Sequence, residues 1–143
     1  MELEQCVNFA LTRAQNTVNQ YFKTRLAPHG VTPGQYGILK CLWDENGLTV
    51  KQIAERMYLD SSTITGLLDR MEQKGLIKRC PDPSDRRALS VVLTPEGERL
   101  EGPVSEAIAL ANQAVLKDVG DAEAQKLMQL LFDVAAGVRQ VLP

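Results

Sequence analysis

The chain has 143 residues, of which 44% are hydrophobic and 24% charged, and its formal net charge is −2. These values are typical of one soluble globular domain, residues 1–143, that buries a sizeable core. No apolar run approaches the roughly 18 residues of a membrane-spanning helix, and the acidic start of the chain lacks the basic region of a signal peptide, so we expect a cytoplasmic protein.

Helical periodicity dominates the first part of the chain. Apolar residues recur at helical spacing over residues 3–27, and Pro28 and Gly30 end this pattern. A second helix begins after Thr32, which forms a capping box with Gln35. Both helices present an apolar stripe, so we expect them to pack against the rest of the fold.

Two shorter helices follow, joined by a tight turn. Thr49 and Gln52 form another capping box, which opens a helix through residue 57. A further helix runs from about residue 61 to residue 74, with Gly75 as its C-cap. Two short helices connected in this way are typical of a helix-turn-helix unit.

The second half contains two strand-like runs and two long helical patterns. Residues 76–80 and 88–93 alternate like strands, and the loop between them is too long for a two-residue hairpin turn. Helices are expected over residues 95–119 and 122–141. The whole order predicts a mainly α fold with a small β-wing: a winged helix-turn-helix lobe over residues 32–94, with long dimerisation helices at 1–30 and 95–143.

The terminal helices favour a dimer. Together they carry more apolar surface than a compact winged helix buries, and such an excess is a common source of a dimer interface. A dimer also suits DNA reading, because it places two recognition helices about 34–36 Å apart, one turn of the double helix.

Charge is distributed unevenly along the chain. Residues 51–87 carry eight basic and six acidic side chains, a net charge of +2, whereas residues 96–143 carry four basic and eight acidic ones, a net charge of −4. The asymmetry is mild, and it favours a central segment that faces a polyanion.

Cysteine and histidine are scarce. The three cysteines are widely spaced, no CxxC pair occurs, and His29 is the single histidine. Neither a disulfide framework nor a structural zinc site is expected. With one histidine, the chain also lacks the residues that most metal sites and catalytic triads require. We therefore expect no catalytic residue, no metal and no cofactor, and an enzyme is the least favoured function class.

Two stretches resemble the MarR family of bacterial winged helix-turn-helix transcriptional regulators. They read LTVKQIAERMYLDSSTITGLLDRMEQKGLIKR and DRRALSVVLTPEG, and the second matches the family's Asp-x-Arg wing followed by LTxxG. The resemblance extends over essentially the full chain and is most specific over residues 36–100. It implies an obligate homodimer whose first, fifth and sixth helices interlock, and binding to a palindromic operator in double-stranded DNA.

The helix over residues 61–74 is the expected recognition helix. Small hydroxyl residues near its start permit close approach to DNA, and backbone amides there attract phosphate. Asp69 suits a cytosine amino group or holds Arg70 or Gln73 in place. The alternative interpretation is a solvated polar face. The expected DNA-contacting residues of this helix are Ser61, Ser62, Thr63, Thr65, Gly66, Asp69, Arg70 and Lys74.

The wing carries Asp85, Arg86 and Arg87. Arginine suits a narrow minor groove, where negative potential is concentrated. The family pattern implies that Arg87 enters the groove and that Asp85 shapes the loop by pairing with it. We expect Arg86 to contact phosphate; the alternative is an exposed charged turn. Weaker candidates for phosphate or fold contacts are Gln35, Lys51, Gln52, Lys78 and Arg79.

Two routes of release from DNA follow from the resemblance, since many family members are repressors released by a phenolic or other small aromatic ligand, or by cysteine oxidation. A ligand pocket lies between the dimer helices and the DNA-binding lobe in the family. The residues that suit such a pocket are Phe9, Arg13, His29, Tyr36 and Trp43. The aromatic ones are equally consistent with plain core.

The redox route depends on Cys6. Peroxide-sensing family members carry a single cysteine in the first helix with tyrosines around the thiol, whereas Ala10 lies one turn on from Cys6 here. Tyr21 and Tyr36 can still approach from elsewhere in the dimer, and the alternative is a small buried hydrophobe or an inert exposed thiol.

The sequence thus predicts a dimeric, sequence-specific DNA-binding regulator, a repressor released by a small aromatic or phenolic ligand. A thiol-based repressor using Cys6 is the first alternative. The alternative of another class is a winged helix used only for protein–protein assembly. Such a protein is expected to have an acidic or apolar recognition face, whereas this one carries hydroxyl residues together with Arg86 and Arg87.

Overall fold

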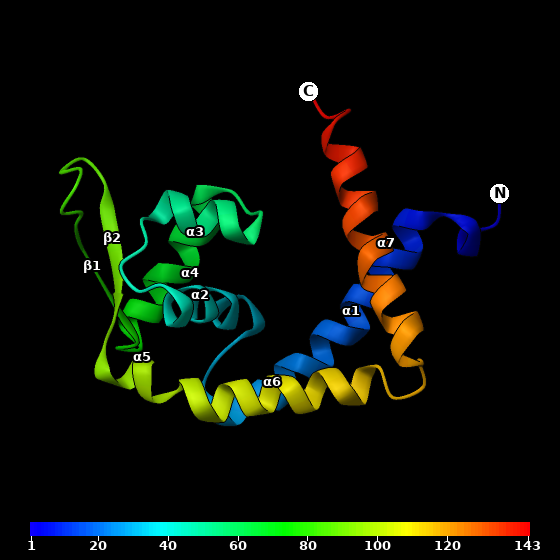
Figure 1. Cartoon of the computed structure of the whole chain (residues 1–143), viewed down its shortest axis with the longest axis horizontal. Coiled ribbons are helices and arrows are strands. Elements are labelled where there is room, and N and C mark those ends of the chain that lie inside the picture. The colour runs from blue at the N-terminus through cyan, green and yellow to red at the C-terminus, as the bar shows by residue number, and fades with distance from the viewer. The chain divides into compact units, whose positions relative to one another are not determined.

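The computed structural model describes residues 1–143, which form seven α-helices, two 3-10 helices and one two-stranded antiparallel sheet (Figure 1). This mainly α fold with a small β-wing confirms the predicted fold class. In chain order the elements are η1 (Leu3–Gln5), α1 (Val7–Leu26), η2 (Ala27–His29), α2 (Pro33–Asp44), α3 (Val50–Met57), α4 (Ser61–Gln73), β1 (Ile77–Pro81), β2 (Leu89–Leu93), α5 (Pro95–Arg99), α6 (Glu101–Val115) and α7 (Asp121–Arg139).

The chain divides into two compact units, Met1–Ile108 and Ala109–Pro143, and α6 crosses the boundary between them. No helix combines the length and the apolar character that crossing a membrane requires. The first unit holds the main core and every element of the winged helix-turn-helix, so the candidate functional site lies within it.

Both predicted capping boxes are present. The Thr32 hydroxyl accepts from the Gln35 amide at 3.2 Å while the Gln35 side chain accepts from the Thr32 amide, also at 3.2 Å. Thr49 and Gln52 repeat this exchange at the start of α3. Each box satisfies two backbone donors that a helix start otherwise leaves without partners, which fixes where α2 and α3 begin.

The expected continuous helix over residues 95–119 is wrong. It is divided into α5 and α6 at Leu100, which caps α5, and α6 ends at Val115. Pro103 gives a physical reason for the division, because it has no amide hydrogen to donate to the Arg99 carbonyl four residues earlier.

The wing strands pair in antiparallel register from Ile77 opposite Leu93 to Pro81 opposite Leu89. Leu48 adds a short third segment, since its carbonyl accepts from the Val91 amide at 2.8 Å. This hydrogen bond ties the start of the helix-turn-helix to the wing.

The core of the first unit forms where the helix-turn-helix packs against α2, the sheet and the ends of α1 and α6. Its largest apolar members are fully buried, so truncating any of them is expected to be costly. They are Leu26, Ile38, Leu39, Leu42, Leu48, Ile53, Ile64, Leu68, Met71, Ile77 and Val91.

The second unit keeps much of its apolar surface exposed. Phe132 is 67% exposed, and other large apolar side chains of α7 and its C-terminal end are uncovered as well. An apolar surface of this extent is typical of an interface with another chain. The exposed residues are Leu110, Leu127, Met128, Leu130, Leu131, Phe132, Val134, Val138, Val141 and Leu142.

Candidate nucleic-acid interface

The turn before α4 fixes the start of the recognition helix. Tyr58 adopts a left-handed conformation with φ of 56°, which ends α3. Asp60 then caps α4: its carboxylate accepts from the Thr63 amide and from the Ser62 hydroxyl, both at 2.7 Å. These bonds, the Ser62 one first, lower the pKa of Asp60 to about 2. The N-cap is therefore Asp60, and Ser61 is the first residue of the helix.

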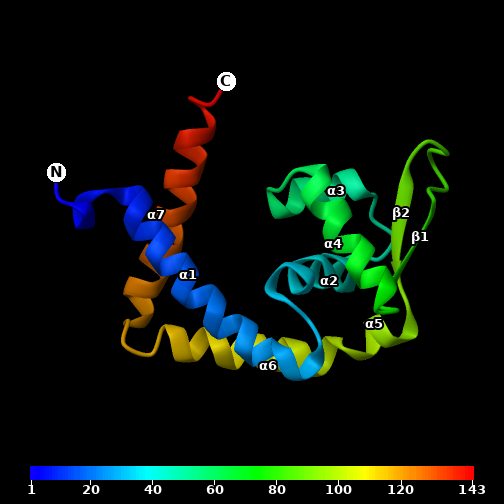
Figure 2. The same cartoon turned by 180° about the vertical axis from the view of Figure 1, so that it is seen from behind.

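The α4 helix has two distinct faces. Ile64, Leu68 and Met71 are fully buried against the core, which holds the helix in place. The opposite face is exposed, and Figure 2 shows α4 beside α3 within the lobe. Its exposed residues include seven of the eight predicted for DNA contact: Ser61, Ser62, Thr63, Thr65, Gly66, Asp69 and Arg70.

Gly66 lies on this exposed face with no structural reason to be glycine. A Cβ at this position would have nothing within 4 Å inside the chain. In a helix interior glycine costs about 1 kcal/mol relative to alanine, so its use here is consistent with a partner that approaches the backbone closely.

Asp69 is held by the wing. Arg79 of β1 donates to Glu72 at 2.8 Å and forms an ion pair with Asp69 at 2.7 Å. Glu72 and then Asp69 raise the pKa of this guanidinium. The expectation that Asp69 holds Arg70 or Gln73 is therefore wrong. Arg79 is a fold contact that joins β1 to α4 and compensates the two α4 carboxylates, Asp69 and Glu72.

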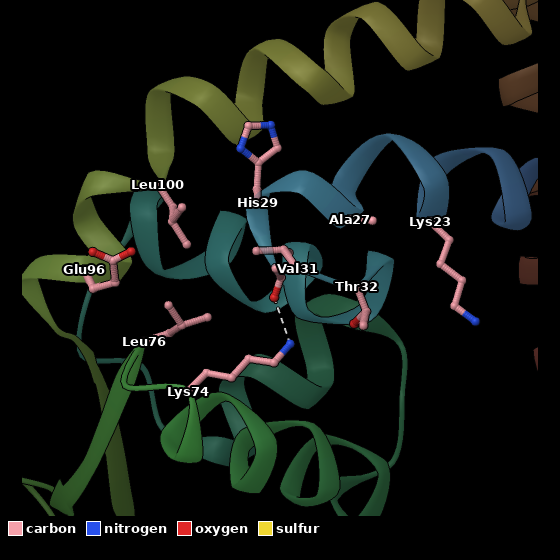
Figure 3. A pocket seen from close by; sticks show the side chains of 10 residues that line it. Lys23, Ala27, His29, Val31, Thr32, Lys74, Leu76, Glu96 and Leu100 are labelled. Atoms are coloured by element: carbon pink, nitrogen blue, oxygen red, sulfur yellow. Dashed lines mark hydrogen bonds between the residues drawn. The ribbon is translucent and has the colours of Figure 1, made fainter.

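Lys74 is exposed, but its ammonium is bound within the protein (Figure 3) and does not extend freely toward DNA as predicted. It caps the C-terminal end of α4, and its ammonium donates to the Gly30 carbonyl at 2.8 Å and to Gln35 Oε1 at 2.9 Å. Gln35 is only 1% exposed, so it too is a fold residue and not a DNA contact. Together these bonds attach the recognition helix to the connection between α1 and α2.

The wing loop is organised by Asp82, which sequence analysis did not single out. Its carboxylate accepts from the amides of Ser84 and Asp85, each at 3.0 Å, and from the Ser90 hydroxyl. The Ser90 bond, first among these, lowers the pKa of Asp82. An aspartate followed by proline and serine is a recognisable turn signal, so Asp82 was detectable in the sequence.

Arg87 stands at the tip of this loop. Its side chain is 92% exposed, and its Nε lies 3.3 Å from Asp85 Oδ1, which also accepts from the Arg87 amide at 3.0 Å. Asp85 thus shapes the loop and pairs with Arg87, as the family pattern implied. Arg86 is exposed beside it. The wing presents two guanidinium groups to solvent.

The five residues expected for a ligand pocket lie in three places. Phe9 and Arg13 line an open hollow of about 380 Å³ on α1. His29 lines a separate groove. Tyr36 and Trp43 pack against the core with ring centroids 6.3 Å apart, and the Trp43 indole donates to the Gly97 carbonyl at 3.0 Å. Within one chain they do not form a single pocket.

All three cysteines are free and half-buried. Cys6 is the N-cap of α1 and not a residue within the helix. Burial raises the pKa of the Cys41 thiol, which keeps it protonated and unreactive. The Cys80 thiol faces the Ser90 carbonyl at 3.9 Å in the wing.

Comparison with known proteins gives relatives of one kind. The chain is 40% identical over 100 residues to the HTH-type transcriptional regulator TtmR of Methylorubrum extorquens (strain PA1), a match that spans 70% of this chain but only 51% of TtmR. It is 39% identical over 101 residues to the organic hydroperoxide resistance transcriptional regulator of Bacillus subtilis (strain 168), covering 71% of this chain and 69% of that protein.

Solved structures agree over nearly the whole chain. The PcaV transcriptional regulator from Streptomyces coelicolor, in complex with its natural ligand, superposes with a TM-score of 0.90 at 29% identity, covering 96% of this chain and 97% of that one. The transcriptional repressor CouR, bound to a 23-mer DNA duplex, gives 0.85 at 28% identity, covering 94% and 95%.

The sequence model of the MarR family matches residues 31–89, which include α2, α3, α4 and the wing loop. The relatives are transcriptional regulators and not enzymes, and the partners of such proteins are DNA and a second copy of the chain. The geometry of the helix-turn-helix and its wing agrees with this assignment. The chain belongs to the MarR family of DNA-binding transcriptional regulators.

Proposed function

We propose that this protein is a dimeric repressor that reads a palindromic operator with α4 in the major groove and the wing in the adjacent minor groove, in the cytoplasm. One observation carries the proposal. The exposed face of α4 bears hydroxyl groups and a glycine, while the wing joined to it through Arg79 presents two exposed guanidinium groups.

The two elements perform different tasks. Side chains of α4 such as Thr63, Thr65 and Arg70 are of the size and chemistry that read base edges in a major groove. Arg87, at the tip of a loop held by Asp82 and Asp85, suits a narrow minor groove where negative potential is strong. The hydrogen bonds that Asp82 and Asp85 accept within the loop favour one loop conformation, which lowers the entropy cost of inserting the arginine.

Replacing Arg87 by alanine tests the wing. The side chain is 92% exposed, so the free energy of unfolding is expected to change by less than about 0.5 kcal/mol. Affinity for DNA selected from a random-sequence pool is expected to fall about tenfold or more. The slope of log affinity against log salt is expected to become shallower by about 0.9 for each phosphate that the variant no longer neutralises.

Arg99→Ala is the matched control, because Arg99 is another exposed arginine in a local ion pair, with Glu96 at 2.6 Å. Its affinity for DNA is expected to match that of the wild type. Equal affinity of the Arg87→Ala variant and the wild type at physiological salt would refute the wing assignment. A protein that binds a protein partner independently of salt, and binds no DNA, would favour an assembly module.

For release, we propose that a small aromatic or phenolic ligand favours a spacing of the two recognition helices that the operator does not fit. PcaV, which superposes closely, was crystallised with its natural ligand. The hollow beside Phe9 and Arg13 has an aromatic wall and a cation, which suits a carboxylate or phenolate on a ring.

A redox mechanism through Cys6 is the second candidate, favoured by the similarity to the organic hydroperoxide resistance regulator. Cys6 is half-buried at the N-cap of α1, so its thiol borders the positive end of a 20-residue helix. Cumene hydroperoxide should then release DNA from the wild type but not from Cys6→Ser. Release of both proteins alike would exclude Cys6 as the sensor.

A further inference from the structure

Ser90 is a polar residue in a buried position of the wing. It lies on β2 with only 3% of its surface exposed, and Gln35 is the only other buried polar residue of the chain. Buried strand positions favour apolar β-branched side chains, and a hydroxyl taken out of water costs free energy unless it finds a partner. The Ser90 hydroxyl therefore needs an acceptor, and the acceptor that it has is the Asp82 carboxylate.

The backbone at Ser90 is held by two segments of the fold. Ser90 lies opposite Cys80 in the antiparallel pair of β1 and β2 (Figure 1), and it also forms an isolated antiparallel bridge with Thr49. Next to it, the Val91 amide donates to the Leu48 carbonyl at 2.8 Å. Because Thr49 is the N-cap of α3, the position of Ser90 is fixed both by β1 and by the start of the helix-turn-helix.

Asp82 extends this fixed position into the wing loop. Its Oδ1 accepts from the Ser90 hydroxyl, while its Oδ2 accepts from the amides of Ser84 and Asp85 at 3.0 Å each. Asp85 in turn binds the Arg87 amide and guanidinium through its own carboxylate. A continuous series of hydrogen bonds therefore runs from the buried part of β2 to the arginine at the tip of the wing.

The bond from Ser90 selects the orientation of the Asp82 side chain. Asp82 is half-buried, so its carboxylate can exchange the loop amides for water at little net cost. The Ser90 hydroxyl is a donor fixed by the sheet, and its bond to a carboxylate is stronger than a bond between neutral groups. The orientation of Asp82, and with it the conformation of the loop, is therefore set from β2.

We propose that Ser90 and Asp82 are positioning residues for DNA binding: the buried hydroxyl fixes the Asp82 carboxylate, which holds the wing loop in the conformation that directs Arg87 into the minor groove. Both residues act through Arg87, by reducing the entropy that the loop loses when the arginine is inserted. The effect on DNA binding rests on the proposed function, whereas the order that Ser90 imposes on the loop does not.

Two variants and a matched control test the proposal by fluorescence anisotropy on a DNA duplex selected by the wild type. Ser90→Ala removes the hydroxyl without changing charge and should weaken binding about fivefold or more. Asp82→Ala should also weaken it, although removing an acid would by charge alone strengthen binding to DNA. Ser84→Ala removes a hydroxyl from the same loop but keeps the amide that donates to Asp82, and it should bind as the wild type does.

A double-mutant cycle shows whether these residues act through the arginine. In an Arg87→Ala background, Ser90→Ala and Asp82→Ala should each change affinity by less than about twofold, because no arginine remains to be positioned. A loss of the original size in that background would be a general effect on the fold and would overturn the proposal, as would wild-type affinity of the single variants. If Ser90→Ala does not fold, the cycle with Asp82→Ala decides.

Hydrogen exchange examines the loop in the absence of DNA. The amides of Ser84 and Asp85 should exchange with solvent at least about threefold faster in Ser90→Ala than in the wild type, while the amides of β1 keep their rates. Unchanged exchange at both loop amides overturns the positioning role. A wild-type protein that binds no DNA refutes the proposed function, and the exchange rates then still decide whether Ser90 orders the loop.

Discussion

Replacing Arg79 by methionine removes the link between the wing strand and the recognition helix while keeping most of the length of the side chain. In the native protein this guanidinium lies 2.7 Å from Asp69 and 2.8 Å from Glu72. The variant therefore leaves two carboxylates uncompensated on α4, the helix proposed to face DNA. We expect a small effect on folding and a larger one on DNA binding.

The loss in the free energy of unfolding is expected to be small because the residues of both ion pairs are partly exposed. The Arg79 side chain is 22% exposed, but Asp69 and Glu72 are 55% and 44% exposed, so solvent screens both pairs. Ion pairs of this kind contribute about 0.2–1 kcal/mol each. The free energy of unfolding should therefore fall by about 1 kcal/mol and the melting temperature by about 3 °C.

The cost to DNA binding is expected to be larger, because the proposed mode of binding places phosphates opposite α4. One uncompensated charge at about 10 Å repels a phosphate by about 0.4 kcal/mol in water. A few phosphates lie within a Debye length of the helix, which gives about 1 kcal/mol for each recognition helix after screening. A dimer has two such helices, so affinity should fall by about 2 kcal/mol, or about thirtyfold.

Fluorescence anisotropy on a fixed DNA duplex measures this loss, and a rescue decides its cause. Adding Asp69→Asn and Glu72→Gln to the Arg79→Met protein removes the two carboxylates and should restore affinity to within about threefold. Arg99→Met is the control, since it uncovers the paired acid Glu96 on α5, outside α4 and the wing. A loss that persists in the triple variant, or an equal loss in the control, would refute the reasoning.

Two further outcomes are expected. Gly66→Ala should raise the free energy of unfolding by up to about 1 kcal/mol in a denaturant titration, because nothing lies within 4 Å of the new Cβ, and should weaken DNA binding; unchanged affinity would show that DNA does not approach this backbone. Asp60 has a pKa of about 2 against 3.8 for the free side chain. The ionised Asp60 cap therefore stabilises the folded protein fully above about pH 4, and this stabilisation is lost as pH falls toward 2. Melting temperatures of the wild type and Asp60→Ala should differ at pH 7 and converge at pH 2, and a constant difference would contradict this.

The features predicted correctly from the sequence are those that depend on residues only a few positions apart in the chain. The capping boxes at Thr32 and Thr49 each involve a partner three residues away, so the pattern alone specifies the bond. The apolar period of 3.6 residues likewise identified the helices, and the Asp-x-Arg pattern identified the Asp85–Arg87 pair.

Partners distant in the sequence were missed for a physical reason. Lys74 lies 44 residues from Gly30 and 39 from Gln35, and only tertiary packing decides that its ammonium donates to both. Nothing in the local sequence separates Lys74 from Arg70, which is also exposed one turn earlier but forms no ion pair. Pro103 was a visible signal, but the apolar period continues from Leu100 to Val104 and conceals the break.

The internal bonds also explain how an acidic chain presents a DNA-binding face. Of the six acids in residues 51–87, five have carboxylates turned toward donors of the protein itself: Asp60, Asp69, Glu72, Asp82 and Asp85. By contrast, four cations of the same segment are exposed and form no ion pair: Lys51, Arg70, Lys78 and Arg86. Net charge averages over both groups, whereas a phosphate approaching α4 and the wing meets the unpaired cations first. Because the positive face depends on where each carboxylate is held, a change that frees those acids weakens DNA binding without removing any residue that touches DNA.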